Sequence, residues 1–258
     1  MKLNKIIKMF ESKYPKSLAC EWDNVGLLIG DSENEIKKVL CALDVSSKVI
    51  DYAVENNFDM IMAHHPLIFK PIKNILIDNP MGYRIIKAIK NDVAIYAAHT
   101  NLDSGINGLN DYVLSLLNLK FEYIYEEESY NKPIRFIELE HQTDIYEIVT
   151  AVKNALNVEN IKLIFDDYYN SKYIKKIAIV TGSGADFIPD VISKVDLMLT
   201  ADVKHHEALD ALEEGLCIID FGHHESESPS IDIIADFLEE NTDVMVERYY
   251  MPSVIKIK

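Results

Sequence analysis

Residues 58–66, FDMIMAHHP, combine a short apolar run with two adjacent histidines and a proline. The run at 58–63 has the length of a buried β-strand. Pro66 cannot donate to a central strand ladder and disfavours helix at His65, so we predict that the strand ends there. Neighbouring residues on a strand point to opposite faces. Both His64 and His65 can therefore face one site only if the chain turns at this point.

Strands and helices alternate on both sides of this stretch. The predicted order is strand 38–43, helix 46–56, strand 58–63, helix 81–91 and strand 93–98. Buried apolar strands joined by helices are typical of a mostly parallel sheet that is covered on both faces. The sequence therefore predicts an α/β fold, with His99 directly after the last strand of this series.

The second half of the chain repeats the plan. It predicts helix 144–156, strand 175–181, a helix near 186–194, strand 195–200, helix 204–214, strand 216–221 and helix 229–240. Three short motifs correspond between the halves: Lys37-Lys38-Val39 with Lys175-Lys176-Ile177, Asp59-Met60-Ile61-Met62 with Asp196-Leu197-Met198-Leu199, and His99-x3-Asp103 with His223-x3-Glu227. We interpret the chain as two related α/β halves, residues 1–125 and 126–258, that arose by duplication. The acidic run at 126–128 between them is interpreted as a solvated loop.

Composition and charge exclude several classes of protein. The 258 residues carry a formal net charge of −16, which argues against a nucleic-acid surface or docking to an anionic membrane. The three cysteines are far apart and predict neither a disulfide framework nor a zinc ribbon. No segment has the roughly 20 apolar residues needed to span a bilayer. We expect a cytoplasmic protein.

Histidines and carboxylates follow several of the predicted strands. In open α/β sheets, sites form outside the carboxyl ends of the strands. The candidate ligands are His64, His65, Asp103, His223 and Glu227. A spacing of four places His223 and Glu227 on one face of a helical turn. Each residue alone could equally cap a turn or lie on the surface, but the set favours a metal site.

The type and number of these ligands indicate which ions they would bind. Three imidazoles with two carboxylates suit zinc, manganese, iron or cobalt. Five ligands exceed the needs of one tetrahedral structural zinc, and they fit two divalent ions that share a carboxylate.

Other polar residues are secondary candidates. His99, His205 and His206 could orient ligands or move protons, and we select His99 and His206 as candidate catalytic residues. Glu225 competes with Glu227 but fits a shared helical face less well. The turn at 182–184, Gly-Ser-Gly, is either an anion cradle or a tight strand-to-helix connection.

A family resemblance covers nearly the whole chain. Its motifs, in order, are EWDNVGLLIG (21–30), ALDVS (42–46), AHHPLIF (63–69), AAHTNLD (97–103), TADVKHHEALDA (200–211) and GHHESE (222–227). They closely resemble the NGG-interacting-factor-three-like family, whose members are also called GTP cyclohydrolase 1 type 2 homologs. His224 departs from the commoner tyrosine after His223, and the C-terminal residues match loosely.

The resemblance implies two similar three-layer α/β/α domains around a dimetal cleft and a ring-shaped homohexamer. It assigns the metal ligands to His64, His65, Asp103, His223 and Glu227, with Glu227 as the bridge. Some members carry a third domain between the halves, for which this chain is too short.

Two functions remain open at this stage. The first is a metal-dependent hydrolase that attacks a purine-like ring or a related bond in a small-molecule substrate, possibly a nucleotide. The second is a non-catalytic protein that binds or delivers metal or regulates a partner. A separate, structural reading is that the ions only hold the two halves together.

Overall fold

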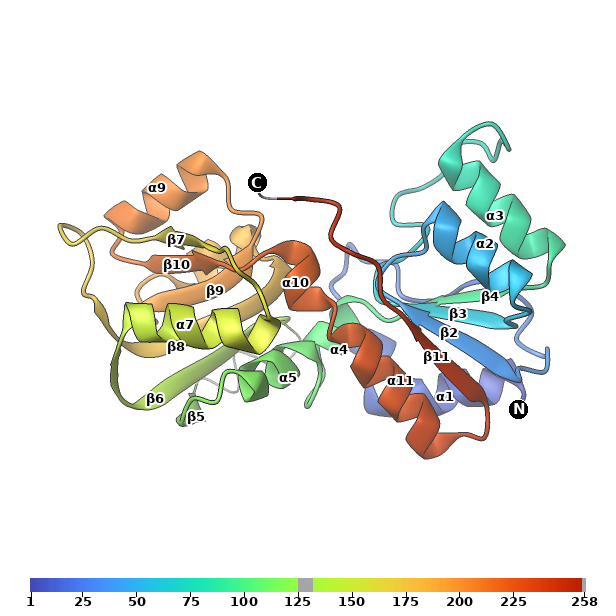
Figure 1. Cartoon of the computed structure of the whole chain (residues 1–258), viewed down its shortest axis with the longest axis horizontal. Helices are drawn as coiled ribbons and strands as arrows, with labels where there is room; N and C mark the ends of the chain where they lie inside the picture. Colours follow the sequence, from blue (N-terminus) through green and yellow to red (C-terminus); the bar gives the residue numbers. More distant parts are fainter. Residues whose placement is uncertain (125–131, 257–258) are drawn as a thin grey trace. The chain divides into compact units, whose positions relative to one another are not determined.

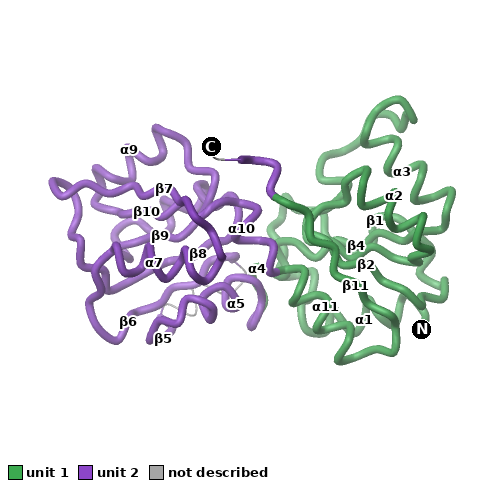
Figure 2. The backbone as a smooth tube through the Cα atoms, in the orientation of Figure 1, with its two compact units in different colours: residues 1–105, 230–252 green, residues 106–229, 253–258 purple. Residues whose placement is uncertain are grey.

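The computed structural model describes residues 1–124 and 132–256 (Figure 1). The chain forms two compact units, which Figure 2 shows in different colours. Unit 1 comprises residues 1–105 and 230–252, and unit 2 comprises residues 106–229 and 253–258. Each unit contains one β-sheet with helices packed on it. The acidic run at 126–128 lies outside the described residues.

Unit 1 is a three-layer α/β/α structure. Its elements are α1 (Leu3–Lys13), η1 (Lys16–Leu18), β1 (Gly26–Ile29), β2 (Lys38–Ala42), α2 (Ser47–Glu55), β3 (Met60–Ala63), α3 (Pro80–Lys90), β4 (Ala94–Ala97), α4 (Thr100–Ser104), α11 (Ser230–Asn241) and β11 (Met245–Tyr249). The sheet order is β1-β4-β3-β2-β11, and only β1 pairs antiparallel with its neighbour. Helices α2 and α3 cover one face, and α1 and α11 cover the other (Figure 1).

The predicted helices of unit 1 form for the expected reasons. The Ser46 side chain accepts a hydrogen bond from the Val49 amide and caps α2. This helix buries Val49, Ile50 and Ala53, the face that the apolar spacing predicts. A core of fully buried side chains then lies between α2, α3 and the sheet, and it includes Leu40, Ile61 and Ile95. This core fixes the strands whose ends carry the candidate ligands.

Unit 2 has a parallel centre with antiparallel strands on both sides. Its elements are α5 (Leu109–Leu116), β5 (Phe121–Ile124), β6 (Arg135–Asp144), α7 (Ile145–Leu156), β7 (Lys162–Ile164), β8 (Tyr173–Ser183), η2 (Ala185–Phe187), α8 (Ile188–Val191), β9 (Leu197–Ala201), α9 (His205–Glu213), β10 (Cys217–Asp220) and α10 (His223–Glu227). The sheet order is β5-β6-β8-β9-β10-β7, with β8, β9 and β10 parallel. Strands β5, β6 and β7 pair antiparallel. The α/β fold class is confirmed.

One predicted helix is shorter than expected. In place of a helix near 186–194, the chain forms the 3₁₀ turn η2 and the four-residue helix α8. Ser193 has a φ of 66°, in the left-handed region, and such a residue cannot continue a right-handed helix. The helix therefore ends before this residue.

The two units share a hydrogen-bond arrangement at the start of their parallel strands. Asp59 Oδ2 accepts hydrogen bonds from the Lys37 and Lys38 amides at 2.7 and 2.9 Å. In unit 2, Asp196 Oδ2 accepts from the Lys175 and Lys176 amides, both at 2.8 Å. The motifs that correspond in sequence thus also correspond in structure, which supports the interpretation as a duplication.

The compact units differ from the expected halves, 1–125 and 126–258, in two respects. After α10 the chain returns to unit 1, where α11 packs on the sheet and β11 pairs in parallel with β2 from Met245↔Lys38 to Tyr249↔Ala42. The expected boundary at 125 lies outside the described residues, and unit 1 ends earlier, at Gly105. His64, His65 and Asp103 belong to unit 1, and His223 and Glu227 to unit 2.

None of the helices in the described ranges has the length and apolar character that crossing a membrane requires.

Candidate metal-binding site

The two adjacent histidines of unit 1 follow strand β3 directly. The His64 and His65 amides donate to the Ala42 and Leu43 carbonyls at 3.1 and 2.9 Å, so the backbone still follows the neighbouring strand. Both rings nevertheless reach one place, because β3 has ended at Ala63. Their centroids lie 5.2 Å apart.

His99 joins these two residues from the end of β4. Its ring centroid lies 5.1 Å from that of His64 and 5.6 Å from that of His65. One nitrogen atom from each of the three rings lies within 4.8 Å of the others, which is close enough for a shared cation. We call these three residues the histidine cluster. His99 was predicted as a catalytic residue, and the structure also places it among the possible ligands.

Asp103 lies in the short helix α4, one turn after His99. The Asp103 amide donates to the His99 carbonyl at 3.2 Å, which orients this turn. The Asp103 carboxylate is buried, and its Oδ1 lies 3.6 Å from His64 Nε2. The structure therefore brings a carboxylate to the histidine cluster, as the sequence predicts.

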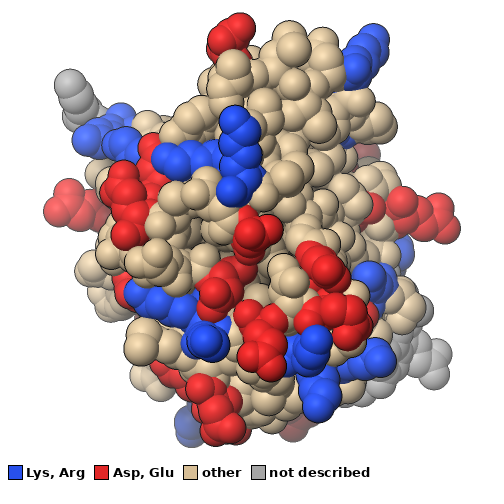
Figure 3. Space-filling model, turned by 90° about the vertical axis from the view of Figure 1, so that its right-hand side faces the viewer, with Lys and Arg blue, Asp and Glu red and all other residues tan. Residues whose placement is uncertain are grey.

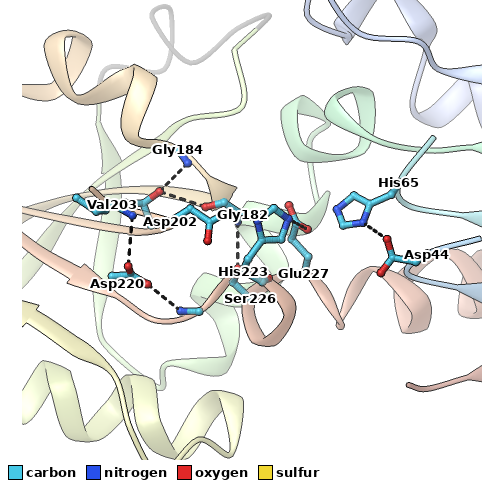
Figure 4. Close-up of polar contacts among 12 residues, drawn as sticks. Asp44, His65, Gly182, Gly184, Asp202, Val203, Asp220, His223, Ser226 and Glu227 are labelled. Carbon is cyan, nitrogen blue, oxygen red and sulfur yellow. Dashed lines mark hydrogen bonds and ion pairs between the residues drawn. The ribbon is translucent and has the colours of Figure 1, made fainter. Parts of the chain in front are cut away.

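The ring nitrogens of His64 and His65 have distinct partners. His64 Nδ1 lies 2.8 Å from the Ala98 carbonyl oxygen, which can only accept, so this nitrogen carries the proton. His65 Nδ1 lies 2.8 Å from Asp44 Oδ1 and donates in the same way (Figure 4). Nε2 then carries the lone pair in both rings. This arrangement is typical of metal-ligating histidines.

His99 is oriented by a buried carboxylate. Its Nδ1 lies 2.9 Å from Asp23 Oδ1, and the Asp23 side chain is fully buried. The Thr100 amide and hydroxyl both donate to Asp23 Oδ2, at 3.1 and 2.5 Å. Burial alone would raise the pKa of Asp23, but the hydrogen bonds and the nearby imidazole lower this pKa to about 2. Asp23 therefore stays ionised and keeps the proton of His99 on Nδ1.

In unit 2, the His223 ring lies between two carboxylates. Its Nδ1 is 2.7 Å from Asp202 Oδ2, and its Nε2 is 2.8 Å from Glu227 Oε2 (Figure 4). His223 begins the single-turn helix α10 and Glu227 ends it, so the spacing of four places both side chains on one face. Glu227 is buried, and its carboxylate lies within hydrogen-bond distance of Nε2 of the ring.

The turn at 182–184 is a tight connection. The Gly182 amide donates to Ser226 Oγ and the Gly184 amide to Thr200 Oγ1, both at 3.0 Å (Figure 4). These two amides are used within the fold and do not support an anion cradle. Gly182 instead allows Glu227 to approach: a Cβ at this position would lie 1.9 Å from Glu227 Oε1.

Three other candidates have less support. His205 and His206 are exposed in the first turn of α9, and their described ring contact is with each other, at 5.3 Å. A catalytic role for His206 stays a prediction. A Cβ on Gly222 would meet Glu225 Oε2 at 2.4 Å, so the Glu225 carboxylate lies over the backbone before α10.

Sequence reasoning missed three carboxylates that orient the histidines: Asp23, Asp44 and Asp202. Asp44 follows β2 and contacts the histidine at the end of the next strand, β3. Asp202 follows β9 and contacts the histidine after β10 in the same way. Asp202 also has a φ of 58°, a conformation that aspartate tolerates better than most residues. For Asp44 and Asp202 the sequence did offer a signal: each follows directly after a strand, and the neighbouring strand in the sheet is followed by the histidine that it contacts.

The donor set fits divalent cations of the borderline class. Each unit places an imidazole nitrogen and a carboxylate oxygen side by side, and Nδ1 of each candidate ligand histidine is held by an oxygen acceptor. Such pairs of electron donors suit zinc, manganese, iron or cobalt. The fold and these residues define a class of two-unit α/β proteins with histidine- and carboxylate-rich strand ends that could hold metal.

The chain belongs to the Duf34/NIF3 (NGG1p interacting factor 3) family, whose model matches residues 1–253. A Clostridium perfringens protein named GTP cyclohydrolase 1 type 2 homolog is 39% identical over 251 residues, covering 96% of this chain and 95% of that protein. A Clostridium acetobutylicum protein of the same name is 35% identical and covers 93% and 90%.

Solved structures agree with the family assignment. Reduced HcgD from Methanocaldococcus jannaschii is 32% identical, with a TM-score of 0.83, covering 96% of this chain and 97% of that one. A Bacillus cereus protein related to NIF3 has a TM-score of 0.86 at 24% identity, covers 100% and 99%, and supports the fold alone. The family resemblance that the sequence motifs indicate is therefore confirmed.

Proposed function

We propose that this protein binds two divalent metal ions and acts as a metal-dependent hydrolase. Unit 1 supplies His64, His65 and Asp103, and unit 2 supplies His223 and Glu227. One observation carries the proposal: in each of the three histidines an oxygen acceptor holds Nδ1, so Nε2 is the nitrogen left for an ion, and Nε2 of His64 and of His223 each faces a carboxylate that could share that ion. Membership of a family with relatives named GTP cyclohydrolase 1 type 2 homolog supports the reaction class.

The bound ions would act as Lewis acids and would lower the pKa of a coordinated water toward neutrality. The residues of this chain would hold the site and move the proton. His99 is suited to accept and return a proton through Nε2, because ionised Asp23 fixes its other nitrogen as the donor. His206 is a second proposed proton carrier, at the start of α9.

A small molecule is the proposed substrate. On the face shown in Figure 3, Lys and Arg side chains are interspersed with Asp and Glu, and the formal net charge is −16. A nucleic acid would need clustered basic residues to neutralise its phosphates. A nucleotide or a related ring compound therefore fits this protein better than a polynucleotide does.

The metal is tested by elemental analysis. Purified protein would be incubated with zinc, manganese, iron or cobalt and then desalted. We expect two ions per chain in the native protein and fewer in His64→Ala and His223→Ala. His141→Ala is the matched control, because this histidine is exposed. Native protein that holds no more metal than the variant lacking both His64 and His223 would refute the proposal.

The reaction is tested separately on metal-loaded protein. Release of formate from GTP would be compared with Asp103→Ala, and a panel of phosphoesters and cyclic amides would be assayed next. We expect turnover that depends on Asp103 for at least one compound. Full metal binding with no turnover on any compound would instead support the non-catalytic role in binding or delivering metal.

We also propose, from family membership, that the protein assembles as a homohexamer in the cytoplasm. Sedimentation equilibrium should then give a mass of six chains. A monomer at micromolar concentration would contradict the assembly without affecting the metal site.

A further inference from the structure

Two large aromatic side chains of unit 1 are exposed beside the histidine cluster. Trp22 is the only tryptophan in the chain, and 58% of its surface is exposed. Phe69 is 43% exposed. Their ring centroids lie 5.9 Å apart, and the rings meet edge to face at 76°. We call this pair the aromatic corner, because the two ring planes meet at a steep angle.

The aromatic corner contacts the histidine cluster through His99. The His99 ring lies 6.3 Å from Trp22 and 6.2 Å from Phe69, and both contacts are edge to face. His99 in turn contacts His64 at 5.1 Å. A molecule that stacks at the corner would therefore lie next to the proposed proton carrier and its neighbouring ligands.

The backbone on both sides of the corner is held in place. Asp23, directly after Trp22, accepts hydrogen bonds from His99 and Thr100. Asn24 Nδ2 donates to the Ile68 carbonyl at 2.5 Å, which ties this segment to the residue before Phe69. Exposed aromatic rings on fixed backbone can bind a flat ligand with little loss of conformational entropy.

We propose that the aromatic corner binds a planar, uncharged nitrogen heterocycle and presents it to His99. The geometry and charge of the site select this class. Flat rings stack on aromatic side chains whatever their substituents. The carboxylates of Asp23, Asp44 and Asp103 all lie at the histidine cluster and disfavour a ligand that carries negative charge when no ion is bound. The inference extends the proposed function, on which it rests for the chemistry that comes after binding.

The single tryptophan allows a direct test on protein treated with chelator. Guanosine and adenosine would be titrated while the fluorescence of Trp22 is recorded, and affinities would be measured in parallel by equilibrium dialysis. We expect quenching by at least one nucleoside and, for Trp22→Leu, binding weakened about 5- to 100-fold. Trp22→Phe should keep most of the affinity, because it keeps a stacking face. Tyr168→Ala, at an exposed tyrosine of unit 2, should leave binding unchanged.

Three results would overturn the inference. The first is no quenching by either nucleoside at millimolar concentration. The second is equal affinity of Trp22→Leu and Tyr168→Ala. The third is binding of GTP to the metal-free protein much more tightly than guanosine, because phosphate would then be the recognised group. Metal uptake measured on a portion of the same preparation that is reloaded with metal after chelation separates this test from the proposed function: nucleoside binding without metal uptake would leave only the aromatic corner standing, and the reverse would leave only the metal site.

Discussion

Gly182→Ala should move a proposed metal ligand without changing any ligand residue. Gly182 has a φ of 66°, and a Cβ built on it lies 1.9 Å from Glu227 Oε1 and 2.7 Å from Glu227 Cδ. Real Cβ contacts are essentially never shorter than 3.0 Å, so the Glu227 carboxylate would have to shift by about 1 Å. It would then lose its place beside His223 Nε2, from which it is 2.8 Å away.

Gly182→Ala is expected to change two quantities separately: the stability of the fold and the affinity for metal. Alanine in the left-handed region costs about 1–2 kcal/mol of folding free energy. Gly215→Ala measures this cost alone, because Gly215 has a φ of 84° and a Cβ there would meet nothing closer than 4.0 Å. Losses of 10- to 100-fold in metal affinity are typical when a ligand's supporting contacts are disturbed. Gly182→Ala should therefore show both effects, and Gly215→Ala only the loss of stability.

Metal affinity would be measured by competition with a chromogenic chelator, and stability by urea denaturation. Similar losses of stability in the two variants, with weaker metal binding only in Gly182→Ala, are the expected result. If both variants bind metal as tightly as the native protein, Glu227 is not a ligand, and the role assigned to this close approach is refuted.

Three further predictions concern the residues that support the site and unit 2. Asp202→Asn should weaken metal binding 10- to 100-fold in the same chelator assay, because His223 loses the carboxylate charge that fixes its Nδ1 proton and raises its basicity, whereas Asp210→Asn on α9 should have no effect. Asn110→Ala should cost about 2–4 kcal/mol in urea denaturation, because the buried Thr181 amide and Pro133 carbonyl both lose a partner; a change below about 0.5 kcal/mol would contradict this explanation. The pKa of Asp23 is lowered from 3.8 to about 2, so its contribution to stability is present above pH 3.8 and is lost as the pH falls toward 2. Melting temperatures across this range should fall less steeply in Asp23→Asn than in the native protein, and parallel curves would count against the assignment.

The apolar runs were sufficient to predict the central strands and the points where they end. Strand β3 ends where Pro66 and the paired histidines indicate, and α10 brings His223 and Glu227 to one face. Both features depend on local geometry, since side-chain direction within one strand or one helical turn is set by spacing. Such features can be predicted from a single sequence.

The features that could not be predicted from the sequence depend on which strands become neighbours in the sheet. The contact of Asp44 with His65 spans 21 residues and exists because β2 and β3 pair in parallel. Strand β11 was not predicted, because only the edge of the unit 1 sheet at β2 gives residues 245–249 a partner. Spacing alone does not show which strand will lie beside another, so these pairings needed the structure.

The hydrogen-bond arrangement that the two units share explains why the framework could be recognised while the chemistry differs between the units. Asp59 and Asp196 hold the start of corresponding strands through the same two backbone amides, which fixes how neighbouring strands begin side by side. That arrangement does not involve the strand ends, and these differ: unit 1 presents three imidazoles with Asp103, whereas unit 2 presents one imidazole between two carboxylates. Because the strands begin alike and end differently, each unit can supply a different share of the proposed ligands on a similar framework. The five proposed ligands are therefore better understood as two unequal sets on related frameworks than as one motif.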